Sequence, residues 1–199
     1  MAFGDQVRDY HAQVTAIDRE IGRLLARLDG LGIGDDTLVV YTSDHGEMLG
    51  SQGRLRKCVF YRESTQVPLL LRHRELLQAG SVCEELIAGI DLPATLLGLC
   101  GIAVPPQMDG LDLSGHLRGE KTDARRRGVP HAMIARGDPR ARDARLALRT
   151  RDRLYIAGEQ EELDATKTDP WEQRNLADDP ARAEDLVACR RLLREELWA

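Results

Sequence analysis

Of the features of this sequence, a short run of apolar and β-branched residues, Thr37 to Thr42, places the strongest constraint on the fold. Its length is typical of a strand, and the lack of polar alternation predicts a strand buried on both faces. Asp44 and His45 follow almost at once, and Gly46 comes next. The chain therefore passes from a core strand directly to a carboxylate, an imidazole and a glycine.

An amphipathic helix is predicted before this strand, because apolar residues recur there at spacings of three and four. These residues are Tyr10, Val14, Ile17, Ile21, Leu24 and Leu28. We expect the helix to end near Gly30 to Gly34, where glycines repeat. A helix followed by a buried strand predicts an α/β fold, here part of a largely parallel sheet with flanking helices.

Two further core elements follow. Val67 to Arg72 is predicted to be a second strand, with Pro68 at its beginning, where a missing N–H costs least. Ile90 to Gly101 is predicted to be a helix. Asp91 is the expected N-cap, and Gly101 is the expected C-terminal stop.

The sequence becomes polar and arginine-rich after Arg118. Arg145 to Thr150 alternates like a half-exposed strand, and Leu154 to Ala157 fits its hairpin partner. A helix is expected in the tail, with one apolar face formed by Leu186, Cys189, Leu192, Leu193 and Leu197. We therefore predict part of an α/β core over residues 1–120 and a small C-terminal α+β lobe of sheet and helix over residues 121–199.

Composition excludes several classes of protein. The net charge of −5, with acids interspersed among the arginines of residues 136–153, leaves no basic surface for nucleic acid. No apolar run approaches the roughly eighteen residues of a membrane span. The first residues have no signal-peptide pattern, which favours a cytoplasmic location. The four cysteines are widely separated, so reduced thiols are expected.

Asp44 and His45 are candidate metal ligands. In open α/β sheets, ligands bind beyond the carboxyl ends of the strands, and both residues are placed there. A carboxylate and an imidazole fixed on one strand end are suitable ligands for a divalent cation. Taken alone, an Asp-His pair in a glycine-rich turn is more often just a turn with a helix cap.

The wider stretch "TSDHGEMLGSQGRLRKCVFYRESTQVPLLLR" (residues 42–72) resembles the sulfatase family of the alkaline-phosphatase superfamily. That family carries a Ser-Asp-His/Asn-Gly segment, a lysine past a glycine-rich turn, an aromatic-x-Glu-Ser segment and a Val-Pro strand. These features fall here on residues 43–46, Lys57, residues 61–64 and residues 67–68. Four motifs in the right order are far more specific than the Asp-His pair alone.

Three later segments extend the resemblance over nearly the whole chain. "IDLPATLLGLCGIAVPPQMDGLDL" is similar to the family's Asp-x-x-Pro-Thr-Leu-Leu helix and the loops after it. "LRTRDRLYIAG" and "EELDATKTDPWEQRNLADDP" resemble its C-terminal sheet and its closing Asp-Pro-x-Glu-x-x-Asn-Leu motif.

The resemblance implies roles for three residues. Asp44 and His45 would be metal ligands, and Lys57 would direct its ammonium at an oxygen of a sulfate or phosphate ester. The family's usual metal would be Ca²⁺, but the imidazole of His45 also suits Mn²⁺ or Zn²⁺. The implied substrate is a sulfate ester of a small molecule or a glycan.

The nucleophile of the family does not occur in this chain. It is a Cys or Ser in a Cys/Ser-x-Pro/Ala-x-Arg motif, and none of the four cysteines here has that context. An apolar strand ending in Asp-Asp, which would give further metal ligands, is also not found. The chain therefore resembles the C-terminal half of a sulfatase, and we expect it to be inactive alone and to self-associate or to require an N-terminal half.

Three functions remain open at this stage. The first is a part of a sulfate ester hydrolase. The second is a part of a phosphonate monoester hydrolase or other phosphodiesterase of the superfamily, which share the histidine found at position 45. The third is a non-catalytic remnant that binds anions weakly or serves as an interaction domain. Gln52 and Gln66 replace the His and Arg of many relatives, so substrate contacts in that loop remain undetermined.

Overall fold

The computed structural model describes residues 3–133 and 145–197. Residues 134–144, which include part of the arginine-rich stretch, lie outside the described residues. The chain divides into two compact units. Unit 1 comprises residues 1–57 and 66–81, and unit 2 comprises residues 58–65 and 82–199. The predicted domain boundary near residue 120 stays a prediction about the organisation of the protein.

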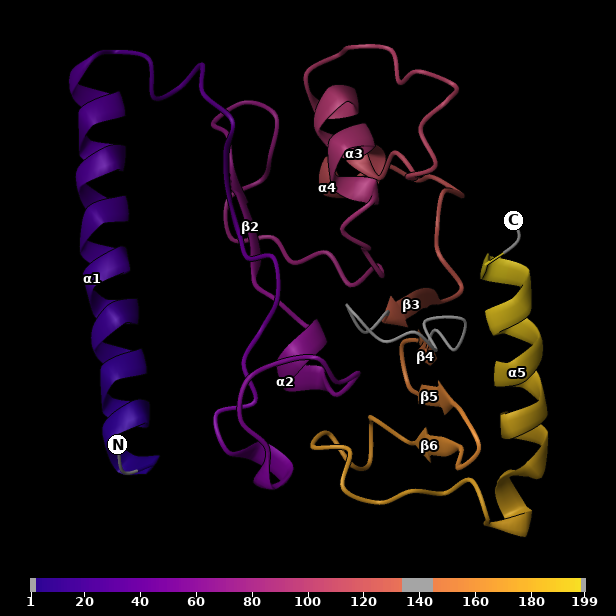
Figure 1. The fold of residues 1–199 in the computed structure, drawn as a ribbon. Helices are drawn as coiled ribbons and strands as arrows, with labels where there is room; N and C mark the ends of the chain where they lie inside the picture. Colours follow the sequence, from indigo (N-terminus) through magenta and orange to yellow (C-terminus); the bar gives the residue numbers. More distant parts are fainter. Residues whose placement is uncertain (1–2, 134–144, 198–199) are drawn as a thin grey trace. The chain divides into compact units, whose positions relative to one another are not determined.

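Unit 1 contains one long helix and one pair of strands (Figure 1). Helix α1 spans Phe3–Gly30 and ends within the glycine-rich segment, as predicted. Strands β1 (Val39–Thr42) and β2 (Leu69–Arg72) pair with each other, and the 3-10 helix η1 (Ser51–Gly53) lies between them in sequence. None of the residues of α1 is buried, so its apolar face is largely exposed in unit 1.

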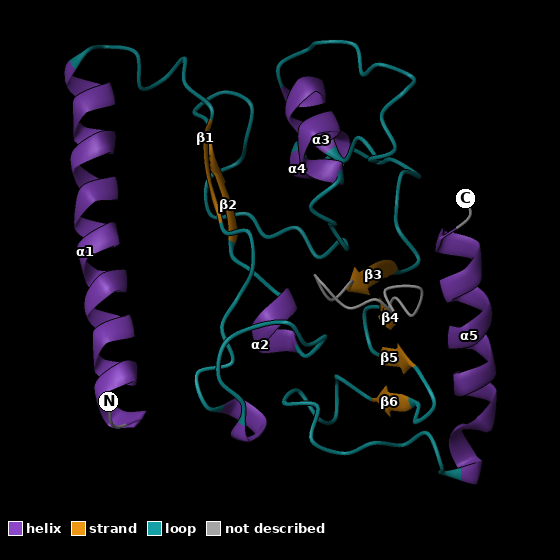
Figure 2. Ribbon diagram, viewed as in Figure 1, coloured by secondary structure: helices purple, strands orange, loops and turns teal. Residues whose placement is uncertain are grey.

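The strands of unit 1 correct one prediction. Strand β1 is half-buried at Val39 and Val40 and exposed at Tyr41 and Thr42, so it is not buried on both faces. Its hydrogen-bonded neighbour among the described strands is β2, which runs antiparallel to it with Val39 opposite Arg72. Every strand pair in residues 3–133 and 145–197 is antiparallel, so the predicted parallel pairing is not found there (Figure 2).

Unit 2 contains the other elements. Its helices are α2, α3, α4, η2 and α5, and its strands are β3 to β6. The bounds of the helices are Arg62–Thr65, Asp91–Leu99, Ser114–Leu117, Pro180–Arg182 and Ala183–Leu197. The bounds of the strands are Val129–Met133, Arg145–Arg149, Leu154–Ala157 and Glu162–Asp164. The four strands form one antiparallel sheet in the order β3-β4-β5-β6.

The sheet of unit 2 has apolar residues packed on both sides. Helix α5 lies alongside the strands (Figure 1), and its predicted face packs against Leu148, Tyr155 and Leu163. A second cluster joins Ala147, Leu154 and Ile156 of the strands to Phe60. The predicted hairpin of β4 and β5 is therefore confirmed. The predicted half-exposure of β4 is wrong, because Ala147 and Leu148 are both buried, one in each of the two clusters.

The prediction for Asp91 needs a correction. Asp91 is the first residue of α3 and is fully buried, and its side chain does not cap the helix. Its carboxylate accepts hydrogen bonds from the amides of Ala88 and Leu111, each at 2.8 Å, and pairs with Arg126 at 2.6 Å. The predicted stop at Gly101 is confirmed: Gly101 has a φ of 70°, which favours glycine, and the amide of Ile102 donates to Leu97 O at 2.9 Å.

Candidate active site

The chain turns sharply after β1 and places Asp44 and His45 next to each other. Ser43 Oγ donates a hydrogen bond to His45 O at 2.9 Å. The amide of His45 donates to Asp44 Oδ1 at 3.0 Å. These bonds span three successive residues, so they fix the local turn in which both side chains stand. The predicted position of the pair at the end of a strand is confirmed.

The ring of His45 has one nitrogen directed at the backbone and one directed outward. Its Nδ1 lies 2.8 Å from Gly46 O, and a carbonyl can only accept, so Nδ1 carries the proton. Nε2 is then left with its lone pair. The ammonium of Lys57 lies 2.5 Å from this Nε2, and Asp44 Oδ2 lies 3.5 Å from it. The structure thus brings together Asp44, His45 and Lys57, the three site residues predicted from the sequence.

The site is open to water. The side chain of Asp44 is 85% exposed and that of His45 is 39% exposed, so solvent reaches both ligand candidates. Desolvation is the largest single influence on the carboxyl of Asp44, and it acts to raise the pKa. The hydrogen bond from the His45 amide, the electrostatic effect of the His45 ring and the positive charge of Lys57 together outweigh it, so the pKa lies below its ordinary value. Asp44 is therefore a carboxylate at neutral pH, as a metal ligand must be.

The donors at this site are few. Within residues 3–133 and 145–197, no group of three or more His, Cys, Asp and Glu side chains is placed to hold a metal ion. Asp44 and His45 offer one carboxylate and one imidazole nitrogen on the same side of the turn. That donor set fits half of a divalent-cation site, since such ions take four to eight donors.

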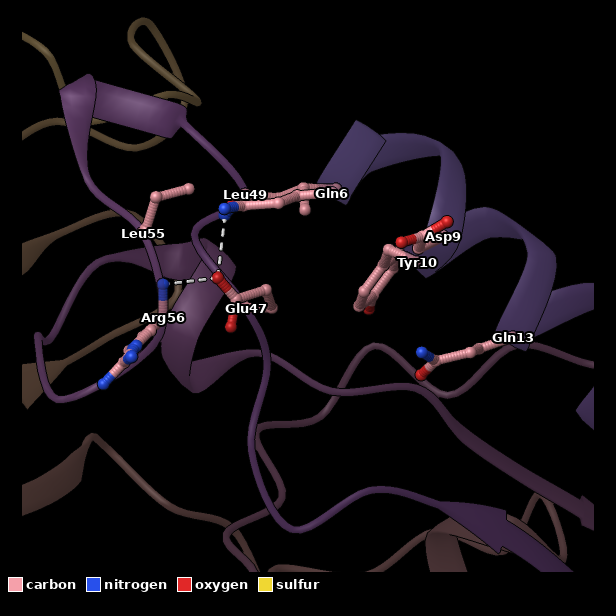
Figure 3. Close-up of a pocket in the computed structure, with 8 residues that line it drawn as sticks. All are labelled: Gln6, Asp9, Tyr10, Gln13, Glu47, Leu49, Leu55 and Arg56. Carbon is pink, nitrogen blue, oxygen red and sulfur yellow. Dashed lines mark hydrogen bonds between the residues drawn. The ribbon is translucent and has the colours of Figure 1, made fainter. Parts of the chain in front are cut away.

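A glutamate that the sequence did not single out stabilises the loop after the site (Figure 3). Glu47 Oε1 accepts hydrogen bonds from the amide of Leu49 at 3.2 Å and from the amide of Arg56. The amide of Met48 donates to Arg56 O at 2.9 Å. Glu47 therefore joins the chain just after His45 to the residue just before Lys57.

A hollow of about 450 Å³ lies in unit 1 beside this loop (Figure 3). It is lined by Gln6, Asp9, Tyr10 and Gln13 of α1 and by Glu47, Leu49, Leu55 and Arg56 of the loop. Asp44, His45 and Lys57 do not line it, so it is separate from the candidate site. Gly50 closes part of the loop: its φ is 93°, and a Cβ there would meet the ring of Phe3.

Two more residues that the sequence did not identify lie in unit 2. Arg149 and Glu172 form a buried ion pair at 2.7 Å, and both contact the segment that begins directly after Lys57. Glu172 belongs to the closing Asp-Pro-x-Glu motif, and that motif was the available signal. No signal in the sequence pointed to Arg149, because an arginine at the end of a predicted strand is usually a surface residue.

Within the described ranges, none of the helices combines the length and the apolar character that a bilayer span requires.

Known proteins resemble this chain in sequence. The model of the Sulfatase family matches residues 2–102. An N-acetylglucosamine-6-O-sulfatase of Bacteroides thetaiotaomicron is 40% identical over 119 residues, which cover 59% of this chain and 21% of the relative.

Solved structures are similar over nearly the whole chain. A protein solved in complex with its substrate D-glucosamine-2-N,6-O-disulfate superposes with a TM-score of 0.82 and 30% identity, covering 94% of this chain and 39% of that one. The phosphonate monoester hydrolase of Agrobacterium radiobacter gives a TM-score of 0.83 and 25% identity, with coverages of 94% and 40%.

These likenesses confirm the predicted α/β class and the sulfatase-like fold. The chain spans 21% of the length of the curated relative and 39% and 40% of the two solved chains. The family match covers half of the chain and agrees with the motifs around Asp44, His45 and Lys57. By its sequence and its fold, this chain belongs to the sulfatase family.

Proposed function

We propose that this chain supplies part of the active site of a sulfate ester hydrolase, with Lys57 contacting the sulfate group and with Asp44 and His45 binding a divalent metal. The observation that carries the proposal is the convergence of the three side chains at the end of β1. Lys57 Nζ lies 2.5 Å and Asp44 Oδ2 lies 3.5 Å from His45 Nε2.

Lys57 has the chemistry that a sulfate ester requires. Its ammonium has three donors and no acceptor, so it can hydrogen-bond to the anionic oxygens of the ester. As the bond between sulfur and the leaving oxygen breaks, negative charge develops on that oxygen. A cation fixed nearby stabilises this charge more than that of the ground state, and it thereby lowers the barrier.

Asp44 and His45 fit the metal half-site that this function needs. The hydrogen bond to Gly46 O leaves His45 Nε2 as a ligand, and Asp44 is ionised. A divalent cation bound there would supply a Lewis acid that polarises the sulfate oxygens. The imidazole favours Mn²⁺ or Zn²⁺, and resemblance to the family favours Ca²⁺.

The 199-residue chain carries no Cys/Ser-x-Pro/Ala-x-Arg sequence for the nucleophile. We therefore propose that it does not hydrolyse sulfate esters alone and acts as part of a longer protein. The first test is to read the coding sequence upstream of Met1. A Cys/Ser-x-Pro/Ala-x-Arg motif in the same frame would support the proposal, and an unrelated gene there would contradict it.

The decisive experiment uses that longer protein with sulfated glucosamines and an aryl sulfate as substrates. Replacing Lys57 by alanine is expected to lower kcat/KM by about 10²–10³, the usual cost of losing one charge-stabilising donor, and to leave the metal content unchanged. Asp44→Ala is expected to abolish both metal retention and turnover. Lys121→Ala, an exposed lysine outside the motif, is the control. Full activity and full metal content in Asp44→Ala would overturn the assignment.

His45 favours a second candidate function, hydrolysis of phosphonate monoesters or phosphodiesters. The phosphonate monoester hydrolase of Agrobacterium radiobacter is as similar in structure as the sulfatases are. Both ester classes present anionic oxygens to a cation such as Lys57. Assaying the longer protein on paired aryl sulfates and aryl phosphonates separates the two, because clear preference for the phosphonate would replace the sulfatase proposal.

A third candidate, a non-catalytic binding remnant, follows from the missing nucleophile motif. It predicts that the purified chain binds sulfate weakly through Lys57 and never turns over an ester. Turnover of an aryl sulfate by the 199-residue chain, lost in Lys57→Ala and kept in Lys121→Ala, would exclude it.

A further inference from the structure

Lys57 lies in a strained turn. The residues on either side of it, Arg56 and Cys58, have φ values of 68° and 74°. Neither is a glycine, so each sits in the left-handed region at a cost of about 1–2 kcal/mol. Such a conformation persists only where the surrounding structure enforces it. Contacts on both sides of Lys57 must therefore hold this turn.

The contacts before Lys57 come from unit 1. Glu47 accepts the amide of Arg56, and the amide of Met48 donates to Arg56 O (Figure 3). Both backbone groups of Arg56 are thus fixed to the chain just after His45. These bonds set the position of one end of the turn.

The contacts after Lys57 come from unit 2. The boundary between the units falls between Lys57 and Cys58, and residues 58–65 belong to unit 2. Phe60 is 2% exposed and packs against Ala147, Leu154 and Ile156 of the sheet. The segment that follows Lys57 is therefore anchored through Phe60 to the apolar core of the C-terminal sheet.

Two buried charged residues then fix the backbone of this segment. Arg149 Nη2 donates to Phe60 O at 3.2 Å, and the amide of Arg62 donates to Glu172 Oε2 at 2.8 Å. Arg149 and Glu172 pair with each other at 2.7 Å, with side chains that are 7% and 0% exposed. Tyr61 adds a hydrogen bond from its hydroxyl to Glu162 at 2.7 Å.

The stability of the protein does not by itself explain this pair. A buried ion pair costs desolvation that its attraction rarely exceeds, so an apolar pair of the same volume would serve stability as well. What an apolar pair would not provide is the acceptor for the Arg62 amide and the donor for Phe60 O. The pair is therefore suited to fixing backbone atoms three and five residues beyond Lys57.

We propose that Arg149 and Glu172 are positioning residues for Lys57: by fixing residues 60–62 to the C-terminal sheet, they hold the strained turn that presents the ammonium to the substrate. The inference rests on the proposed function of Lys57. It also assigns a use to the closing Asp-Pro-x-Glu motif, whose glutamate lies 115 residues further along the chain.

The test reads the position of Lys57 directly. The chain has three lysines, Lys57, Lys121 and Lys167, so reductive methylation with ¹³C-formaldehyde gives three dimethyl-lysine signals in an NMR spectrum, beside that of the N-terminal amine. Glu172→Gln keeps an acceptor and removes the charge. It is expected to move the Lys57 signal and to leave those of Lys121 and Lys167 in place. Arg62→Pro removes the backbone donor together with the guanidinium, at a first helical position that accepts proline, and is expected to give the same shift, whereas Arg62→Ala, which loses only the guanidinium, is not.

Asp91→Asn is the matched control. It breaks another largely buried ion pair of unit 2, with Arg126, at 2.6 Å, but this pair holds α3 and not residues 58–65. A merely structural role for Glu172 predicts the same spectrum for Glu172→Gln and Asp91→Asn. An unmoved Lys57 signal in folded Glu172→Gln and Arg62→Pro would overturn the proposal.

Activity of the longer protein gives the second readout. Glu172→Gln is expected to lower kcat at least about tenfold with bound metal unchanged, whereas Asp91→Asn should stay within about twofold at a temperature where both are folded. If Lys57→Ala proves fully active, the proposed function fails, but the NMR test still reports whether Glu172 sets the position of Lys57. If Lys57→Ala is inactive while Glu172→Gln keeps full kcat, only the positioning proposal fails.

Discussion

The two units differ in how their residues are used. Unit 1 carries Asp44, His45 and Lys57, yet its long helix α1 has no buried residue and its sheet has two strands. Unit 2 carries none of the three, but it packs a four-stranded sheet between two apolar clusters. The residues of the candidate site therefore belong to the loosely packed unit. The eight residues directly after Lys57, residues 58–65, belong to the well-packed unit.

This contrast predicts where the stability of the chain resides, and it sets the largest expected effect. Leu148 is fully buried between β4 and α5, so Leu148→Ala should cost about 2–5 kcal/mol of unfolding free energy. Ile17 of α1 is 52% exposed, so Ile17→Ala should change it by about 0.5 kcal/mol or less. Urea unfolding of both variants compares them. Equal costs would show that α1 is as well packed as the sheet.

The second prediction concerns a buried carboxyl in unit 2. Asp164 is 2% exposed, and its Oδ2 has no hydrogen-bond partner among the described residues. Burial, followed by the charges of Glu172, Glu162 and Asp169, raises its pKa to about 7, and Arg149 offsets this only in part. The folded protein therefore keeps the proton that the unfolded chain releases near pH 4.

Stability should then fall as the pH rises from about 4 to about 7, by up to about 1.4 kcal/mol per pH unit and a few kcal/mol in all. The amide of Asn in Asp164→Asn has no proton to lose in this pH range. The stability of this variant should therefore change little between pH 4 and pH 7, and at pH 8 it should exceed that of the wild type. Asp123→Asn, at an exposed position, is the control. Thermal melts at pH 4, 6 and 8 measure the difference, and parallel profiles for wild type and Asp164→Asn would contradict the prediction.

The third prediction concerns the exposed face of α1. Val14, Ile17 and Leu24 are 47%, 52% and 56% exposed and lie at helical spacing on one face. Contiguous exposed apolar surface favours association, so we expect the isolated chain to self-associate. Ile17→Glu should weaken that association about tenfold, and Arg19→Glu, off this face, should not. Sedimentation over a range of concentrations tests it. A monomer at every concentration would show that the face needs no cover.

The sequence allowed most of the elements to be predicted, together with a candidate site whose three side chains lie close to one another in the structure. Periodicity gave α1 and the tail helix, and the spacing of motifs gave Asp44, His45 and Lys57. Local patterns succeed for the two helices because each helix depends on neighbours in sequence. The Lys57 ammonium and the His45 ring are twelve residues apart, and family spacing rather than any local rule linked them.

Features that depend on distant residues were not predicted. Arg149 gave no signal, because its partners Phe60 and Glu172 are 89 and 23 residues away. The burial of β4 on both faces was missed for the same reason, since Phe60 covers one face and α5 covers the other. Asp91 looked like a helix cap but pairs with Arg126, 35 residues further on.

The smallest expected effect concerns the metal. Two donors on one turn give a weak site, since water must fill the remaining positions. The isolated chain should bind Mn²⁺ or Ca²⁺ only in the high-micromolar range or more weakly, about −5 kcal/mol. Asp44→Ala should remove this binding, since it deletes the one carboxylate of the pair.

Lys57 should oppose the metal in the isolated chain. Its ammonium lies 2.5 Å from His45 Nε2, the same lone pair that a cation would use, and it also repels a second positive charge. Repulsion between unit charges about 4 Å apart in water is about 1 kcal/mol, so it is about 2 kcal/mol with a divalent cation, and salt at physiological strength screens it to about 1.2 kcal/mol. Lys57→Ala should therefore tighten Mn²⁺ binding up to about eightfold. Calorimetry on wild type, Lys57→Ala and Lys121→Ala measures this. Weaker binding in Lys57→Ala alone would contradict this prediction and would mean that Lys57 supports the binding of the metal by Asp44 and His45.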